Sequence, residues 1–192
     1  MTKLSLLEKA ENYVSDLFLN ANTSGLYYHD FNHTIAVVES VKKIATAINL
    51  SIDETEVLIL SAWFHDVGYL YTRTEHEAKS IEIVKNALRP NYTQLTPTVI
   101  TYIAATKVGN VPQSKLAAIL KDADTAFGSA YDYVKTSNSY RKELNVSEGK
   151  TFADDVWRQM CIDFLEGVTF YSEYGKQYFE PLVKQNLEKY KQ

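Results

Sequence analysis

Cysteine is almost absent from this chain. Its 192 residues include one, Cys161, so no disulfide can form within the chain, as suits a reducing compartment. The N-terminal residues Met1–Glu8 lack the apolar run of a signal peptide. No stretch approaches the roughly 20 apolar residues that span a bilayer. These absences predict a soluble, cytoplasmic protein.

The chain also lacks a cluster of basic residues. Twenty Lys and Arg against 24 Asp and Glu give a formal net charge of −4, whereas proteins that bind nucleic acids usually present a basic face. We therefore expect neither a nucleic-acid polymer nor a membrane as partner. A few local cations would still suffice to hold a small phosphorylated ligand. The sequence leaves the oligomeric state open.

Convincing β-strand patterns, internal repeats and Pro/Gly/Ser-rich linkers are missing as well. Apolar residues instead recur at three- and four-residue intervals along most of the chain, as they do on the buried face of helices. The 45% apolar fraction is ordinary for a globular protein of this length. The apolar positions after Trp157 are too few to form a separate hydrophobic core. We predict one all-α domain spanning residues 1–192.

Local signals predict where several helices begin and end. Ser51 and Glu54 have the spacing of a capping box, and Gly68 is expected to terminate the helix that they begin. Either Asp30 or Asn32 is expected to cap the helix before it. A helix from Glu75 is expected to end before Pro90, another to begin at Thr96-Pro97, and about three more to follow residue 130, with breaks at Gly149, Gly167 and Gly175.

The most informative residues are histidines and aspartates in otherwise apolar, helix-like surroundings. His33, His65, Asp66 and Asp122 stand in such surroundings, where imidazoles and carboxylates are costly to bury unless they are paired or bound to a metal. Adjacent helical residues point about 100° apart. His65 and Asp66 can therefore reach one ion only near a helix end, which Gly68 would provide. This set predicts one metal site built from three helices.

Other interpretations of these residues are open from spacing alone. A lone histidine on an apolar helix is more often a core residue with its own hydrogen-bond partners than a metal ligand. A His-Asp pair is not specific, since His29-Asp30 is a second one and Asp30 is explained as a helix cap. Asp124 cannot share a helical face with Asp122, so we expect it to be a supporting or capping carboxylate.

The pattern resembles the HD-domain metal-dependent phosphohydrolases. Their motif is a His, a His-Asp pair and a distant Asp, each on a different helix of an all-α bundle, and the four residues above match it in order, spacing and setting. The chain is most similar to small members that open with Tyr-His-x-x-x-His, as in Tyr28–His33. Those members continue with Asn/His-Glu-x-x-Ser, as in His76–Ser80. The likeness is firm over about residues 25–130 and weaker beyond.

This resemblance implies an HD-domain helical bundle whose metal-site core lies in about residues 25–130, with the C-terminal helices packed on it. It implies that His33, His65, Asp66 and Asp122 hold a divalent ion. Such His/Asp sets suit Mn, Fe, Co, Ni or Zn better than Ca, and Mg is also a candidate. Two-metal members carry extra histidines where this chain reads Ile103-Ala104-Ala105-Thr106-Lys107. We therefore expect one ion, although His76 could approach it.

The resemblance also implies hydrolysis of a phosphate ester or anhydride of a small metabolite, and we expect a nucleotide. Four protein ligands leave positions on a six-coordinate ion for water and a phosphate oxygen. Candidates for catalytic roles are Glu77, His76 and Asp66. Candidates for substrate binding are His29, Arg73, Lys79 and Lys107, and Lys121 is a further cation near the last Asp.

Each candidate has a simpler alternative. Arg73 and Glu77, four residues apart, could form a surface ion pair, and Lys79 and Lys121 could be ordinary solvated lysines. The 14 tyrosines offer rings on which a nucleobase could stack, but tyrosine also commonly lines grooves between helices.

The function has alternatives too. One is a sensor module that binds metal and nucleotide without turnover. Another is a metal that only ties helices together, which is disfavoured because structural sites are usually closed by Cys and His. The (p)ppGpp hydrolases carry a Glu-Asp pair shortly after the His-Asp, where this chain has Val67-Gly68-Tyr69-Leu70-Tyr71. That substrate is therefore disfavoured.

Overall fold

The computed structural model describes residues 4–88 and 94–192, and within these ranges the chain is helical with no strand. The predicted all-α fold is confirmed. The α-helices are α1 (Leu6–Asn20), α2 (Phe31–Ala47), α3 (Ile52–Phe64), α4 (His76–Ala87), α5 (Thr96–Thr106), α6 (Lys115–Phe127), α7 (Tyr133–Glu148), α8 (Asp154–Gly167) and α9 (Glu180–Lys191). A 3₁₀ turn, η1 (Val67–Leu70), and a π-helical turn, η2 (Gly175–Phe179), complete them. Pro90 lies outside the described residues.

Helix starts follow the local chemistry of the sequence. Ser5 and Ser51 both form capping boxes, with Glu8 and Glu54 respectively. Asp30, rather than Asn32, caps α2, and its carboxylate accepts the backbone N–H of His33. These contacts satisfy N–H groups that the first turn of a helix leaves without partners.

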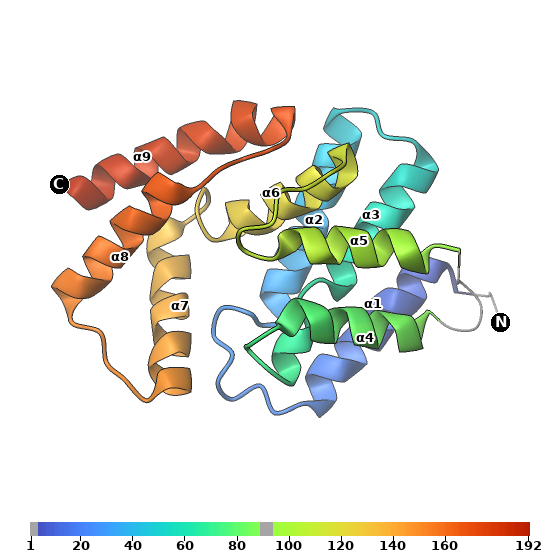
Figure 1. The fold of residues 1–192 in the computed structure, drawn as a ribbon, viewed down its shortest axis with the longest axis horizontal. Helices are drawn as coiled ribbons and strands as arrows, with labels where there is room; N and C mark the ends of the chain where they lie inside the picture. Colours follow the sequence, from blue (N-terminus) through green and yellow to red (C-terminus); the bar gives the residue numbers. More distant parts are fainter. Residues whose placement is uncertain (1–3, 89–93) are drawn as a thin grey trace.

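The helices form two groups with α6 between them (Figure 1). On one side α2 packs against α3 and α6, while α5 packs against α3, α4 and α6. On the other side α8 packs against α9. The buried apolar side chains form one continuous core that runs from Leu6 in α1 to Val183 in α9. In the described ranges, no helix combines the length and the apolar character needed to cross a membrane.

Hydrogen bonds attach the last helices to one another and to the end of α6. The side-chain amide of Asn186 donates to the carbonyl oxygens of Ser129 and Ala130, at 2.9 and 3.1 Å. The hydroxyl of Tyr133 donates to the carbonyl oxygen of Cys161 at 3.1 Å. The C-terminal helices therefore pack directly against the chain that leaves α6.

The turn after α3 differs from the expectation. α3 ends at Phe64, and Gly68 lies inside η1 rather than at the helix end. The backbone N–H of Gly68 donates to Ser80 Oγ at 2.9 Å, and a Cβ at position 68 would overlap the carbonyl oxygen of His76. Gly68 is therefore required for the close approach of α4 to the turn.

We predict that Gly68→Ala destabilises the fold by about 1–3 kcal/mol, because the added methyl group meets backbone rather than a movable side chain. Gly167→Ala, at the end of α8, is the control, since no atom lies within 4 Å of the added carbon. Urea unfolding followed by circular dichroism measures both. An unchanged midpoint for Gly68→Ala would show that the turn and α4 separate at little cost.

Candidate metal centre

Four side chains from α2, the end of α3 and α6 meet in a compact cluster, the HD cluster. It consists of His33, His65, Asp66 and Asp124, and their ligand atoms all lie within 4.8 Å of one another. The two Nε2 atoms are 3.1 Å apart. Asp66 Oδ2 lies 3.2 Å from His33 Nε2, and Asp124 Oδ1 lies 3.4 Å from the same atom. Both histidines are fully buried, whereas the Asp124 side chain is 24% exposed.

Local backbone geometry brings His65 and Asp66 to the same point. His65 keeps helical angles of φ −56° and ψ −40°, while Asp66 leaves the helix with φ −116° and ψ 7°. Two adjacent residues of a continuous helix would point in different directions. The end of α3 at Phe64 therefore lets both side chains face His33.

Hydrogen bonding sets the tautomer of the neutral His65 ring. Its Nδ1 lies 2.8 Å from the carbonyl oxygen of Ala62, which can only accept, so Nδ1 carries the proton. The Nε2 lone pair of the neutral ring therefore faces the HD cluster, as metal-bound histidines require. The ring of His33 contacts Tyr28 and Phe127, with centroids 5.4 and 4.7 Å away.

The HD cluster attracts positive charge. Burial disfavours charged imidazoles, but Asp66 and Asp124 raise the pKa of both His33 and His65 above the usual range. Burial likewise opposes ionisation of the two carboxyls, yet the histidines hold their pKa values below the usual range. Two carboxylates and two imidazoles with converging ligand atoms form a donor set that fits a divalent ion such as Mn, Fe, Co, Ni or Zn.

Asp122, predicted as the fourth ligand, lies outside this cluster. Its carboxylate accepts the backbone N–H groups of Tyr171 and Ser172, at 2.9 and 2.7 Å, and the Ser172 hydroxyl at 2.6 Å. The structure therefore places Asp124, expected from the sequence to be a supporting or capping carboxylate, with the other three candidate ligands in place of Asp122. Residues two apart on a helix point about 200° apart, so only one of the pair can face α2 and α3.

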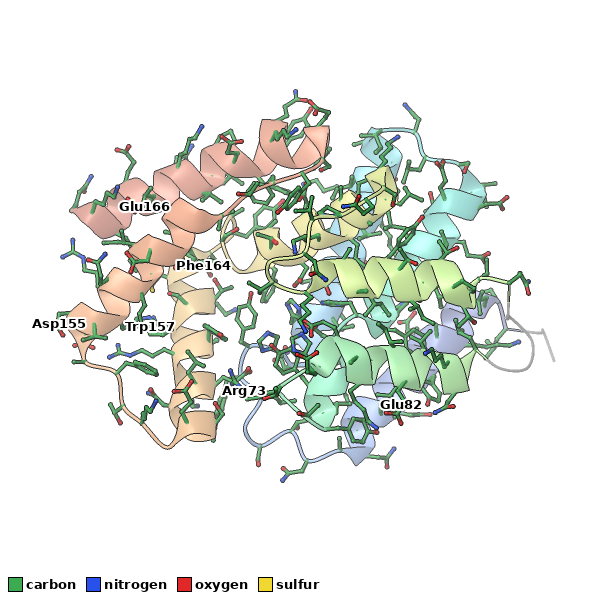
Figure 2. All side chains as sticks on the ribbon, viewed as in Figure 1. Arg73, Glu82, Asp155, Trp157, Phe164 and Glu166 are labelled. Carbon is green, nitrogen blue, oxygen red and sulfur yellow. The ribbon has the colours of Figure 1, made fainter. Side chains whose placement is uncertain are left out.

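The predicted acid/base candidates lie beside the cluster. His76 Nε2 is 3.5 Å from Asp66 Oδ1 and 3.3 Å from Glu77 Oε1. Glu77 is buried, with 7% of its surface exposed, so it is not half of a surface pair with Arg73. Arg73 instead donates to Ser147 Oγ at 2.9 Å and lies 3.7 Å from Glu143 Oε1. In Figure 2, Arg73 lies on the side of the first helix group that faces α7.

His29 lies next to the site, as expected from its place four residues before His33. The centroids of these two rings are 5.8 Å apart. His29 stacks on Tyr69 with centroids 3.6 Å apart, and Tyr69 stacks on His76 at 3.9 Å. Three rings therefore form a wall beside the HD cluster.

The lysine candidates form ion pairs or hydrogen bonds with residues outside the HD cluster. Lys79 forms a 2.9 Å ion pair with Glu82, and Lys107 forms a 2.6 Å pair with Glu75. Lys121 is buried, which lowers its pKa, and it donates to the carbonyl oxygens of Ala105 and Lys107 at the end of α5. The structure thus gives Lys121 a helix-capping role. Lys79, Lys107 and Arg73 each form an ion pair, and their roles in substrate binding, like that of His29, stay predictions.

Glu143 is a residue that sequence reasoning missed. Its side chain is 1% exposed, and Oε1 lies 2.5 Å from His29 Nδ1. Burial opposes its ionisation, but the hydrogen bonds from His29 and from backbone N–H groups lower its pKa to about 2. Burial lowers the pKa of His29, and Glu143 only partly offsets this. Position 143 follows Arg141 and Lys142, and nothing in that polar context indicates a buried carboxylate.

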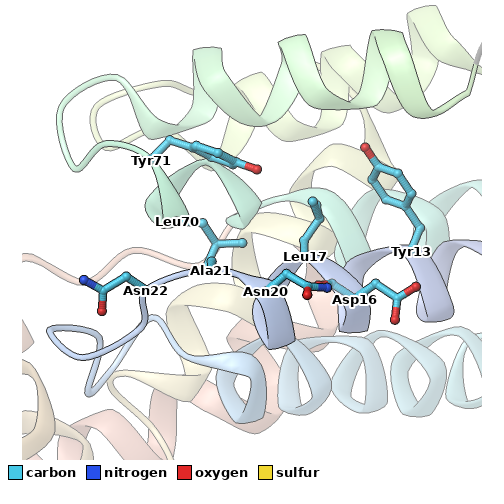
Figure 3. Close-up of a pocket in the computed structure, with 8 residues that line it drawn as sticks. All are labelled: Tyr13, Asp16, Leu17, Asn20, Ala21, Asn22, Leu70 and Tyr71. Atoms are coloured by element: carbon cyan, nitrogen blue, oxygen red, sulfur yellow. The ribbon is translucent and has the colours of Figure 1, made fainter.

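A separate pocket lies between α1 and η1 (Figure 3). It is lined by Tyr13, Asp16, Leu17, Asn20, Ala21, Asn22, Leu70 and Tyr71. None of these residues belongs to the HD cluster or to the ring wall beside it. The pocket is therefore not part of the candidate metal centre.

The chain matches one known protein family over the residues of this site. The family model described as the HD domain matches residues 30–126, just over half of the chain, and this range contains the whole HD cluster. The chain belongs to the HD-domain family. No curated protein and no solved structure matches it. Membership places this HD protein in a superfamily of metal-dependent phosphohydrolases. His29 and Glu143 lie outside the matched range.

We predict that Asp124→Asn loses most of its bound metal, because the substitution removes one of two ligand charges. Asp122→Asn should retain the metal but unfold about 1–3 kcal/mol more easily, because buried N–H groups lose a charged acceptor. Plasma emission after dialysis measures the metal, and thermal unfolding measures stability. Metal lost from Asp122→Asn and kept by Asp124→Asn would restore the original assignment.

Proposed function

We propose that this HD protein is an enzyme that hydrolyses a phosphate ester or anhydride of a small metabolite, with one divalent ion held by His33, His65, Asp66 and Asp124. The observation that carries the proposal is the HD cluster itself, which presents two imidazole nitrogens and two carboxylates to one point. The Asp124 side chain is 24% exposed and that of His76 is 17% exposed. Solvent thus reaches two of the side chains at the site, as access for a substrate requires.

A bound divalent ion would lower the pKa of a water molecule and neutralise charge on the phosphoryl group. Beside it, the His76–Glu77 pair supplies an imidazole and a carboxylate within 3.3 Å of each other. Glu77 can accept a proton from the attacking water or keep His76 oriented toward Asp66. Asp66, next to His76, joins the ligand set to this pair.

For the substrate we propose a nucleotide. Arg73 offers a guanidinium to a phosphate, and its side chain is 33% exposed. Tyr140 supplies an aromatic ring close by, with its centroid 6.0 Å from that of His29. The net charge of −4 supports a small ligand rather than a polymer.

We predict metal-dependent release of phosphate from at least one member of a panel of nucleoside mono-, di- and triphosphates and p-nitrophenyl phosphate, assayed with Mn, Fe, Co, Ni, Zn and Mg. Asp124→Asn should abolish the activity. Turnover of p-nitrophenyl phosphate alone would support the phosphohydrolase but not the nucleotide. Stoichiometric binding of metal and nucleotide without turnover under any condition would identify a sensor module instead.

We predict that Glu77→Gln lowers kcat by about 10²–10⁴ while metal content stays unchanged, since the amide keeps the size but cannot act as a base. Glu82→Gln makes the same change on the same helix at an exposed residue, labelled in Figure 2, and should leave kcat unchanged. Loss of metal from Glu77→Gln would make Glu77 part of the ligand set. Activity near that of the wild type would exclude its catalytic role.

A further inference from the structure

The carboxylate of Glu143 makes two different sets of hydrogen bonds, in addition to its 3.7 Å ion pair with Arg73. Its Oε2 accepts the consecutive backbone N–H groups of Tyr27, Tyr28 and His29, at 3.0, 2.8 and 3.0 Å. Its Oε1 lies 2.5 Å from Nδ1 of His29. One side chain of α7 therefore binds both the segment that leads into α2 and the imidazole at its end.

These contacts determine the tautomer of His29. An ionised carboxylate has no proton to give, so the hydrogen between Glu143 and His29 is on Nδ1. The Nε2 of the neutral ring then carries a lone pair and can only accept a hydrogen bond. Stacking on Tyr69, with 12° between the ring planes, and the edge contact with Tyr28 restrict the orientation of the ring.

The position of His29 gives this lone pair a use. The ring lies 5.8 Å from the ligand His33 and 6.3 Å from His76, between centroids. Among the described residues, no hydrogen-bond partner is assigned to His29 Nε2. A group at this place can therefore contact a molecule bound at the HD cluster without giving up an existing bond.

We propose that Glu143 is a positioning residue that holds His29 in the Nδ1–H tautomer, so that Nε2 accepts a hydrogen bond from a water molecule or a substrate hydroxyl group at the metal centre. This inference rests on the proposed function, because it assigns His29 a contact in the substrate complex. It also gives α7, which follows the residues matched by the HD family, an indirect part in the reaction, through His29.

Glu143→Gln tests the tautomer without removing the side chain. The amide oxygen can still accept the three backbone N–H groups, but the amide NH₂ must donate to Nδ1, which moves the ring proton of His29 to Nε2. Long-range ¹H–¹⁵N NMR reads this directly, since the chain has four histidines. Glu148→Gln, on the exposed part of α7, is the control and should leave the His29 signals unchanged.

The kinetic consequence follows from the switch of Nε2 from acceptor to donor. With the substrate that is turned over fastest, kcat/KM of Glu143→Gln should fall roughly 10–100-fold, the usual effect of losing an orienting partner, with metal content and circular dichroism unchanged. If Glu143 acts through His29, Glu143→Gln should cause no further loss in a His29→Ala background.

Three results would overturn the inference: an unchanged tautomer in Glu143→Gln, a switched tautomer with kcat/KM within twofold of the wild type, or losses that add in the double variant. Failure of the proposed function looks different. In that case the wild-type protein hydrolyses nothing in the panel, while the NMR comparison still reads the tautomer.

Discussion

The structure depends on one demanding arrangement, the burial of two carboxylates against two imidazoles where α2, α3 and α6 meet. Like charges held this close would repel each other, and each group alone would be costly to remove from water. The ligand atoms therefore need a shared positive charge, which a bound divalent ion would supply. Two irregular features of the fold follow from this need. α3 stops at Phe64 so that neighbouring side chains converge, and Gly68 lets α4 bring His76 against the turn.

Two carboxylates outside the HD cluster attach the C-terminal third of the chain to it. Asp122 accepts the backbone N–H groups of Tyr171 and Ser172, and Glu143 accepts those that lead into α2. In both cases a buried carboxylate accepts hydrogen bonds from backbone N–H groups. Unlike side-chain donors, these groups cannot rotate away. The last helices are thus fixed relative to the metal centre at two points. The C-terminal helices therefore hold parts of the site in place as well as covering it.

Sequence and structure agree where the determining interactions are local. The caps at Ser51 and Asp30 involve residues within one turn, and His33, His65 and Asp66 stand out because their neighbours are apolar. Choosing between Asp122 and Asp124 needs the direction of each face of α6, and that helix is buried on several sides. Only the structure shows that the face of α6 that carries Asp124 and Phe127 is the one that contacts His33. Glu143 could not be found, because the backbone groups that it accepts lie more than 110 residues away in the chain.

Tyr69 contacts both imidazole–carboxylate pairs of the site, His29–Glu143 and His76–Glu77. It follows Asp66 by three residues and stacks on both His29 and His76. The pairs themselves differ in the way that their proposed roles require. His29 and Glu143 are buried and 2.5 Å apart, so their geometry is fixed before a substrate arrives. His76 is partly exposed and 3.3 Å from Glu77, a looser contact that can be exchanged for one with water or substrate. Transfer of a proton needs an exchangeable pair such as His76–Glu77. Positioning of a substrate needs a fixed pair such as His29–Glu143.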